Sequence, residues 1–292
     1  MMKKILVPVD FSRHTDFSSR FALQIARKTG SEIILFHSFF DQFYYSDGGM
    51  TTGFESGIMM TDEIILDFYK QKEQLLINLK NDLQALNAEK DSMPVNITCQ
   101  MESGNPEVQI IRAIEKHIPD LIILGSGGMG RKGLMAGSVT RRIIDLTTIP
   151  VIAVPDISEI EGIRNVAYMT SFSTEDPAVI SAIDELLEEF RIDIFCLHLS
   201  KDEKDPEAMQ RMQELSASKA LEHLKERMSY YIVKQDHDKE ILQNFMVTHQ
   251  IGLIAFIPHH RNVFENLFYQ GITKEELFRT RIPLLALKPG QQ

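Results

Sequence analysis

The sequence predicts an α/β protein in which one domain occurs twice, each copy an open parallel sheet with helices on both faces. Short apolar segments rich in β-branched residues alternate with amphipathic helical segments along the 292 residues. Ile122, Ile123 and Leu124 form an unbroken apolar run, which is typical of a strand covered on both faces. The order of segments in the first half recurs in the second half, which predicts two copies of a single fold.

Three pairs of similar segments define this repeat. KILVPVDFS at 4–12 matches NVAYMTSFS at 165–173, and at the same offset IILFHS matches IFCLHLS, so that His37 aligns with His198. The third pair, IPVIAVP at 149–155 and IPLLALKP at 282–289, has a shorter offset, so the first copy contains an insertion in its middle. We therefore expect one domain at 1–157 and a second at 158–292.

The elements of the first copy follow in order, with recognisable end signals. The expected strands cover 4–9, 32–37, 95–101, 121–125 and 151–154. A helical apolar period at 14–28 ends at Gly30, a residue that commonly terminates helices. Asn105 and the proline after it form an N-terminal signal for a helix at 107–117.

An aromatic and glycine-rich insertion near 39–61 supplies most of the extra length of the first copy. Long segments of this kind usually pack on their own domain. An exposed aromatic cluster also forms lids and subunit contacts. The sequence leaves both alternatives open.

Composition and charge limit the classes of function. The chain has 31 Lys+Arg, 41 Asp+Glu and a formal net charge of −10, and this acidic balance argues against binding to nucleic acid, which needs clustered positive charge. Cys99 and Cys196 are too few for a disulfide scaffold or a four-cysteine zinc site. The sequence contains neither a signal-peptide pattern nor an apolar stretch of the roughly 20 residues that a membrane helix needs. We expect a cytoplasmic protein with no nucleic-acid or membrane partner.

The segment between the strand at 121–125 and a helix at 138–146 carries a chemical signature, because it is rich in glycine. Glycines let the backbone approach a phosphate, and a helix start adds free N–H groups and a positive dipole. The P-loop pattern fails because Arg131 follows Gly130 directly, and GxGxxG at 128–133 follows the fourth strand rather than the first. The alternatives are a phosphate or nucleotide contact and a merely flexible loop.

Together these motifs resemble the universal stress protein family: VPVDFS in the first strand, ILFHS in the second, and GSGG followed by GSVT and PVIAV. The resemblance covers nearly the whole chain as two tandem copies. It implies five-stranded parallel sheets of order 3-2-1-4-5, in the adenine-nucleotide α-hydrolase-like class. It further implies an adenine nucleotide, ATP or a relative with or without Mg²⁺, held by Pro8, Asp10, Ser38, Leu124, Gly125, Gly128, Gly137, Ser138, Val139 and Thr140.

Within that resemblance, Asp10 would meet the ribose or adenine, Pro8 and Ser38 the base, and residues 137–140 the phosphates. Eight residues separate Gly128 from Gly137, where the family has nine. We expect a stress-response or signalling module that binds nucleotide in the first domain and has no catalytic residues. A nucleotide-free structural adaptor and a slow ATP-hydrolysing enzyme are the alternatives.

The second copy departs from the binding pattern. Ser171 replaces Asp10, Met169 replaces Pro8, and Ile257 stands at the first glycine position, where a side chain blocks the backbone approach. We therefore expect no nucleotide in this copy.

The histidines are expected to be structural rather than catalytic. His37 and His198 are expected to be hydrogen-bonded. His259 and His260 are expected on a surface loop, because a metal site needs three or four converging ligands.

The family also pairs domains through the last strand of the sheet. Here 151–154 and 284–287 would pair within one chain, because an apolar edge strand needs covering. A homodimer of such chains, with the aromatic insertion as a candidate contact, is a further expectation.

Overall fold

The computed structural model describes residues 2–39, 62–88, 94–126, 138–156, 162–200, 202, 204–234, 240–258 and 282–289. The first half contains β1 (Lys4–Pro8), α1 (Arg13–Thr29), β2 (Glu32–Phe39), α2 (Asp62–Ala88), β3 (Ile97–Ser103), α3 (Pro106–His117), β4 (Leu121–Gly125), α4 (Ser138–Leu146) and β5 (Val151–Val154). The second half contains β6 (Asn165–Met169), α5 (Asp176–Leu186), η1 (Glu188–Phe190), β7 (Asp193–Ser200), α6 (Pro206–Ser216), η2 (Lys219–Arg227), β8 (Met228–Lys234), α7 (Glu240–Thr248), β9 (Ile251–Phe256) and β10 (Leu284–Ala286).

The described strands form one sheet of order β3-β2-β1-β4-β5-β10-β9-β6-β7-β8. The order 3-2-1-4-5 is confirmed in the first half, and the second half has the same order when it is read from β8 inward. Strands within each half are parallel. The two five-stranded units meet where β10 pairs antiparallel with β5, with Leu285 opposite Ile152.

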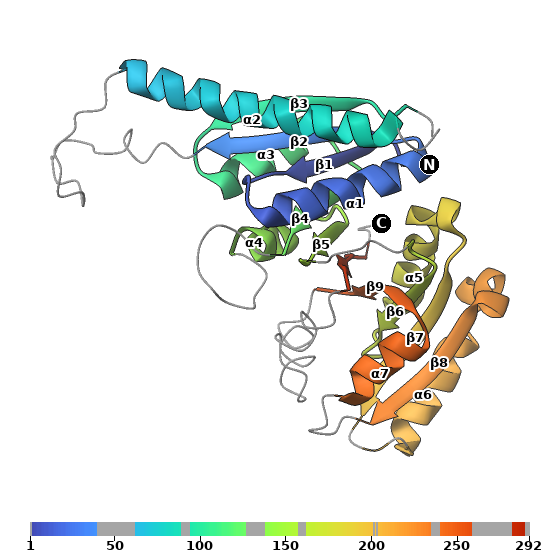
Figure 1. Cartoon of the computed structure of the whole chain (residues 1–292). Coiled ribbons are helices and arrows are strands. Elements are labelled where there is room, and N and C mark those ends of the chain that lie inside the picture. Colours follow the sequence, from blue (N-terminus) through green and yellow to red (C-terminus); the bar gives the residue numbers. More distant parts are fainter. Residues whose placement is uncertain are drawn as a thin grey trace, which may run out of the picture.

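Helices cover both faces of this sheet (Figure 1). One face packs against α1, α2, α5, α6 and η2 through buried residues such as Phe21 and Ile180. The other face packs against α3, α4 and α7 through residues such as Ile143 and Met246. Each core contains residues from both halves, so the two halves share their hydrophobic packing.

The sequence repeat extends to unusual backbone conformations. Phe11 and Phe172, which occupy equivalent positions of the repeat, both adopt the left-handed region, with φ of 58° and 61°. Gly30 ends α1 with φ 69°, and Arg191, the residue that aligns with it in the second copy, has φ 49°. The left-handed turn is therefore kept even where glycine is replaced by a residue with a side chain.

Most expected elements of the first half are present with small shifts at their ends. The strands at 121–125 and 151–154 and the helix at 138–146 have the expected bounds, whereas β3 runs over Ile97–Ser103 instead of 95–101. The insertion near 39–61 lies outside the described residues, apart from Phe39 at the end of β2. None of the described helices is long and apolar enough to cross a membrane.

Candidate functional site

The candidate site lies at the carboxyl ends of β1 and β4, which are neighbours at the centre of the first-half sheet. From β1 the chain continues to β2 on one side, and from β4 it continues to β5 on the other. Open α/β sheets bind ligands in the crevice outside the strand ends at such a switch point.

Three of the predicted site residues share one face of the sheet at this edge. Leu6, Phe36 and Ile122 pack in the core beneath α3 and α4. Side chains alternate along a strand, so Pro8, Ser38 and Leu124, each two positions further along, face the same side. The base-pocket candidates and the start of α4 are therefore on the same side of the sheet.

Asp10 follows β1 and is held by the first turn of α1. Its Oδ1 accepts a hydrogen bond from the Ser12 backbone N–H at 3.0 Å and another from Thr15 Oγ1 at 2.9 Å. The Thr15 hydroxyl in turn accepts from the Asp10 backbone N–H at 3.1 Å. Both carboxylate contacts use Oδ1, and no partner of Oδ2 is found among the described residues. The half-buried carboxylate is thus fixed in orientation with one oxygen still able to accept.

His37 has a structural role beside Asp10. Its Nδ1 donates to the Val9 carbonyl at 2.8 Å, and its ring packs against Phe11 with centroids 4.5 Å apart. Burial lowers the pKa of His37, and the Lys72 ammonium lowers it further. The imidazole is therefore neutral at neutral pH.

The second half repeats this arrangement. His198 Nδ1 donates to the Thr170 carbonyl at 3.0 Å, and the His198 ring packs against Phe172. The expectation that His37 and His198 are hydrogen-bonded is confirmed.

Gly125, the last residue of β4, is required by helix packing. A Cβ at this position would lie 2.7 Å from the His14 Cβ and 3.2 Å from the His14 carbonyl oxygen. The first turn of α1 therefore sits directly on the end of β4, a contact for which the sequence holds no local signal. Gly128 and Gly137 lie outside the described residues, so their roles stay predictions.

Thr140 ties the two ends of the glycine-rich segment together. Its buried hydroxyl donates to the Gly125 carbonyl at 2.9 Å, which joins α4 to the end of β4. A hydroxyl has one proton to donate, so in this structure Thr140 anchors the segment rather than presenting a donor to a phosphate. Ser138 is the first residue of α4, and Val139 packs partly buried beside the core beneath it.

In the second half, a carboxylate on the first turn of α5, that of Asp176, is buried in the core. Asp176, which is 1% exposed, accepts from Tyr168 Oη at 2.8 Å and from Thr170 Oγ1. It occupies the helix position that corresponds to Thr15 in the first copy. Burial raises the pKa of Asp176, and the hydrogen bonds from Thr170 and Tyr168 oppose that rise. Ile257 at the first glycine position is 4% exposed and packs in the core.

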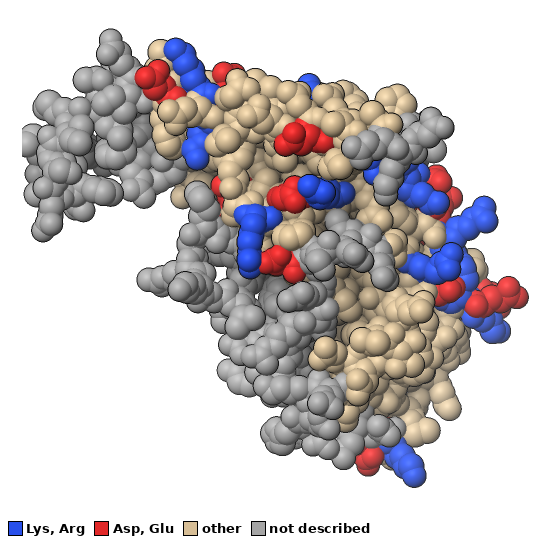
Figure 2. All heavy atoms as spheres, in the orientation of Figure 1, with Lys and Arg blue, Asp and Glu red and all other residues tan. Residues whose placement is uncertain are grey.

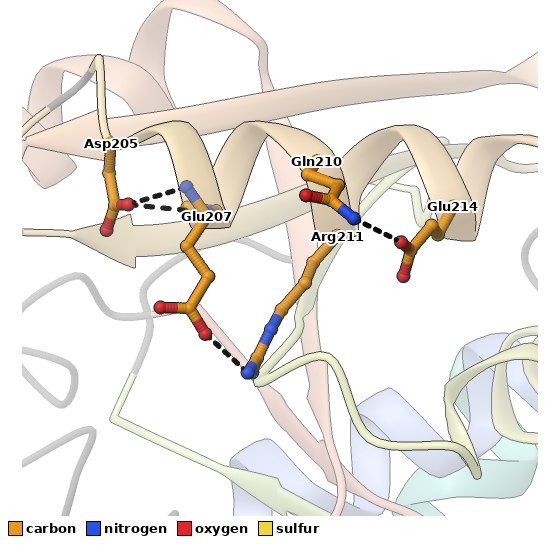
Figure 3. A network of polar contacts seen from close by, with 6 residues as sticks. Asp205, Glu207, Gln210, Arg211 and Glu214 are labelled. Atoms are coloured by element: carbon orange, nitrogen blue, oxygen red, sulfur yellow. Dashed lines mark hydrogen bonds and ion pairs between the residues drawn. The ribbon is translucent and has the colours of Figure 1, made fainter.

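A second polar cluster lies on α6 and stabilises that helix (Figure 3). Asp205 caps it by accepting from the Glu207 and Ala208 backbone N–H groups at 3.0 and 3.3 Å. Along the helix, Arg211 pairs with Glu207 at 2.6 Å, and Gln210 donates to Glu214 at 3.0 Å. Contacts between side chains one helical turn apart on an exposed helix contribute only about 0.2–0.5 kcal/mol each.

Neither the charges on the face drawn in Figure 2 nor the metal-binding side chains of the described residues suggest another kind of site. On the face shown in Figure 2, Lys and Arg side chains are interspersed with Asp and Glu. Among the residues that the structure describes, no three His, Cys, Asp or Glu side chains are grouped so that they could hold a metal ion.

The structure is an α/β protein with a mostly parallel sheet and helices on both faces, and comparison with known proteins gives the family. The universal stress protein family model matches residues 1–155, and the chain belongs to that family. Universal stress protein MJ0577 of Methanocaldococcus jannaschii is 25% identical over 156 residues, which is 53% of this chain and 95% of that protein. Universal stress protein YxiE of Bacillus subtilis is 26% identical over 160 residues, which is 53% of this chain and 99% of that protein.

A solved structure resembles the whole chain. The crystal structure of a universal stress protein from Archaeoglobus fulgidus superposes with a TM-score of 0.68 at 19% sequence identity. The match covers 99% of this chain and 97% of that one. It therefore shows a shared fold that extends through both halves of the chain.

Proposed function

We propose that this chain is an adenine-nucleotide-binding stress-response module with its ligand site in the first half. The observation that carries the proposal is the arrangement of side chains at the ends of β1 and β4, the neighbouring strands from which the chain continues in opposite directions. There, Pro8, Ser38 and Leu124 face the side on which α4 begins, and Asp10 is held beside them.

In this proposal the chain binds its ligand through backbone and carboxylate groups. The start of α4 offers N–H groups and a positive dipole to the phosphates, and Gly128 and Gly137 allow the backbone to approach them. Asp10 accepts a hydrogen bond from the ribose or the base, or supplies one carboxylate to Mg²⁺ bound with the phosphates. The net charge of −10 is no obstacle, because backbone N–H groups bind phosphate without an excess of Lys and Arg.

The second half, as we propose it, is a degenerate universal stress protein domain that binds no nucleotide and serves as the pairing partner of the first. The boundary lies near 157–158. Two observations support the absence of a nucleotide site in this half. The Asp176 carboxylate is buried and accepts hydrogen bonds from Tyr168 and Thr170, and the Ile257 side chain occupies the first glycine position. The β5–β10 pairing supports the partner role.

A nucleotide-free adaptor is the second candidate, and the eight-residue spacing between Gly128 and Gly137 favours it. A loop one residue shorter than in the family leaves less room for a triphosphate than for adenosine or a monophosphate.

Calorimetric titration with ATP, ADP and AMP, together with extraction of nucleotide from the purified protein, separates the two candidates. We expect binding to the wild type and at least about a tenfold higher Kd for Gly137→Val. Gly162→Ala is the matched control, because a Cβ at Gly162 meets nothing within 4 Å.

If titration detects no binding and the purified protein contains no nucleotide, the nucleotide-free adaptor is the function that remains. An affinity that Gly137→Val leaves unchanged would place the ligand elsewhere.

A further inference from the structure

An ion pair joins the start of α1 to the end of β5 at the candidate site. Arg13, the first residue of α1, contacts the carboxylate of Asp156, which lies just beyond the end of β5. The two residues are far apart in the sequence, and no sequence motif indicates that they meet. Their side chains are 73% and 34% exposed, so the pair lies at the surface of this edge.

The pair flanks the point where the chain leaves β4. His14, next to Arg13, packs directly on Gly125. On the other side, the Ser126 backbone N–H donates at 2.7 Å to the carbonyl of Val154, which is close to Asp156 in the chain. The Arg13–Asp156 pair therefore bridges the start of α1 and the end of β5, close to Gly125, where the glycine-rich segment begins.

The helix that follows the glycine-rich segment also begins near the end of β4. Thr140, in the first turn of α4, donates to the Gly125 carbonyl, so α4 begins close to where β4 ends. A phosphate held at the start of α4 would thus lie at the same edge of the sheet as the Arg13–Asp156 pair.

The chemistry of the Arg13–Asp156 pair favours replacement of the Asp156 carboxylate by a phosphate group. Exposed ion pairs contribute little to stability because solvent screens them and two long side chains lose freedom. An arginine guanidinium binds phosphate through two parallel charge-assisted hydrogen bonds, and phosphate carries more negative charge than one carboxylate. A bound di- or triphosphate would therefore compete successfully with Asp156 for Arg13.

We propose that Arg13 is a phosphate ligand of the nucleotide site and that Asp156 holds it in the absence of nucleotide. The assignment rests on the proposed function, and it makes the preference for phosphorylated ligands depend on a side chain outside the glycine-rich segment. Asp156 is then a competitor, so removing it strengthens binding while removing Arg13 weakens it.

Titration of Arg13→Gln and Asp156→Asn with ATP, AMP and adenosine tests this assignment. We expect Arg13→Gln to raise the Kd for ATP about tenfold, with Arg13→Lys between it and the wild type. Asp156→Asn should lower the Kd for ATP about two- to fivefold, because it releases Arg13. The Kd for adenosine should change by less than about twofold in both variants, because adenosine has no phosphate.

Arg20→Gln is the matched control. Arg20 lies on the same helix and pairs with Asp16 at 2.9 Å, and both side chains are about half exposed, at 51% and 52%. Its substitution should leave all three affinities unchanged, and thermal melting confirms that each variant is folded.

Two kinds of result overturn the proposal. A wild type that binds none of the three compounds removes the proposed function and this assignment together. A wild type that binds ATP while Arg13→Gln changes its Kd by less than about twofold, or while Asp156→Asn weakens binding, removes the assignment alone.

Discussion

Removing the buried carboxylate of the second half tests whether it is a structural group. In Asp176→Ala, the hydroxyls of Tyr168 and Thr170 both lose their acceptor. Both residues are buried, at 0% and 6% exposure, so water cannot replace the lost contact without opening the core.

The magnitude follows from these two groups. Each buried donor left without a partner costs about 1–3 kcal/mol. The loss of a buried charge offsets part of that cost, because burial raises the pKa of Asp176. We expect a net loss of about 3 kcal/mol in the free energy of unfolding at pH 7.

Urea unfolding followed by circular dichroism measures this loss. Asp16→Ala, at a surface position of α1, is the control and should change stability by less than about 1 kcal/mol. A change below about 1 kcal/mol for Asp176→Ala would refute the view that this carboxylate holds the second half together.

The pH dependence of the same site has a definite sign. The folded-state pKa of Asp176 is raised, so its contribution to stability is fully present below the unfolded pKa and is lost as pH rises through the folded pKa. Wild type should therefore gain stability relative to Asp176→Asn as the pH falls from about 7 to about 4. A stability difference that does not change with pH would contradict this reading.

Two further substitutions test one contact in each half: the packing of α1 on the end of β4, and the pairing of Arg227 with Asp184. Gly125→Ala should lower the free energy of unfolding by about 1–3 kcal/mol, because the new Cβ meets the Cβ and backbone of His14. An unchanged denaturant midpoint would mean that α1 does not pack tightly on the end of β4. Arg227→Met should lower the free energy of unfolding by about 1–3 kcal/mol, because Arg227 donates to both carboxylate oxygens of Asp184 at 2.8 and 3.3 Å. Neither side chain is fully exposed. A loss below about 1 kcal/mol, as for an exposed ion pair, would contradict this expectation.

The repeat and the strand order could be predicted from the sequence because they depend on local patterns. The apolar runs, Gly30 after α1 and Asn105 before α3 carry their own end signals, and Asn105 does accept from the Glu107 and Val108 backbone N–H groups. The alignment of His37 with His198 appears in the structure as two equivalent hydrogen bonds to backbone carbonyls.

Contacts between distant segments could not be predicted in this way. Nothing near Gly125 in the sequence indicates that α1 packs on it, and nothing near Thr140 indicates that its hydroxyl is committed to the Gly125 carbonyl. The sequence repeat aligns Asp176 with Thr15, but it does not indicate that this carboxylate is buried and accepts from Tyr168 and Thr170. The pairing of Arg13 with Asp156 depends on the order of the strands and not on a motif.

The central claim is that one adenine nucleotide binds per chain, at the ends of β1 and β4. A crystal structure of the protein grown with ATP tests it most directly. We expect one nucleotide, with its base beside Pro8 and Ser38 and its phosphates at the start of α4. Crystals without nucleotide at saturating ATP, or with nucleotide at the ends of β6 and β9, would contradict it.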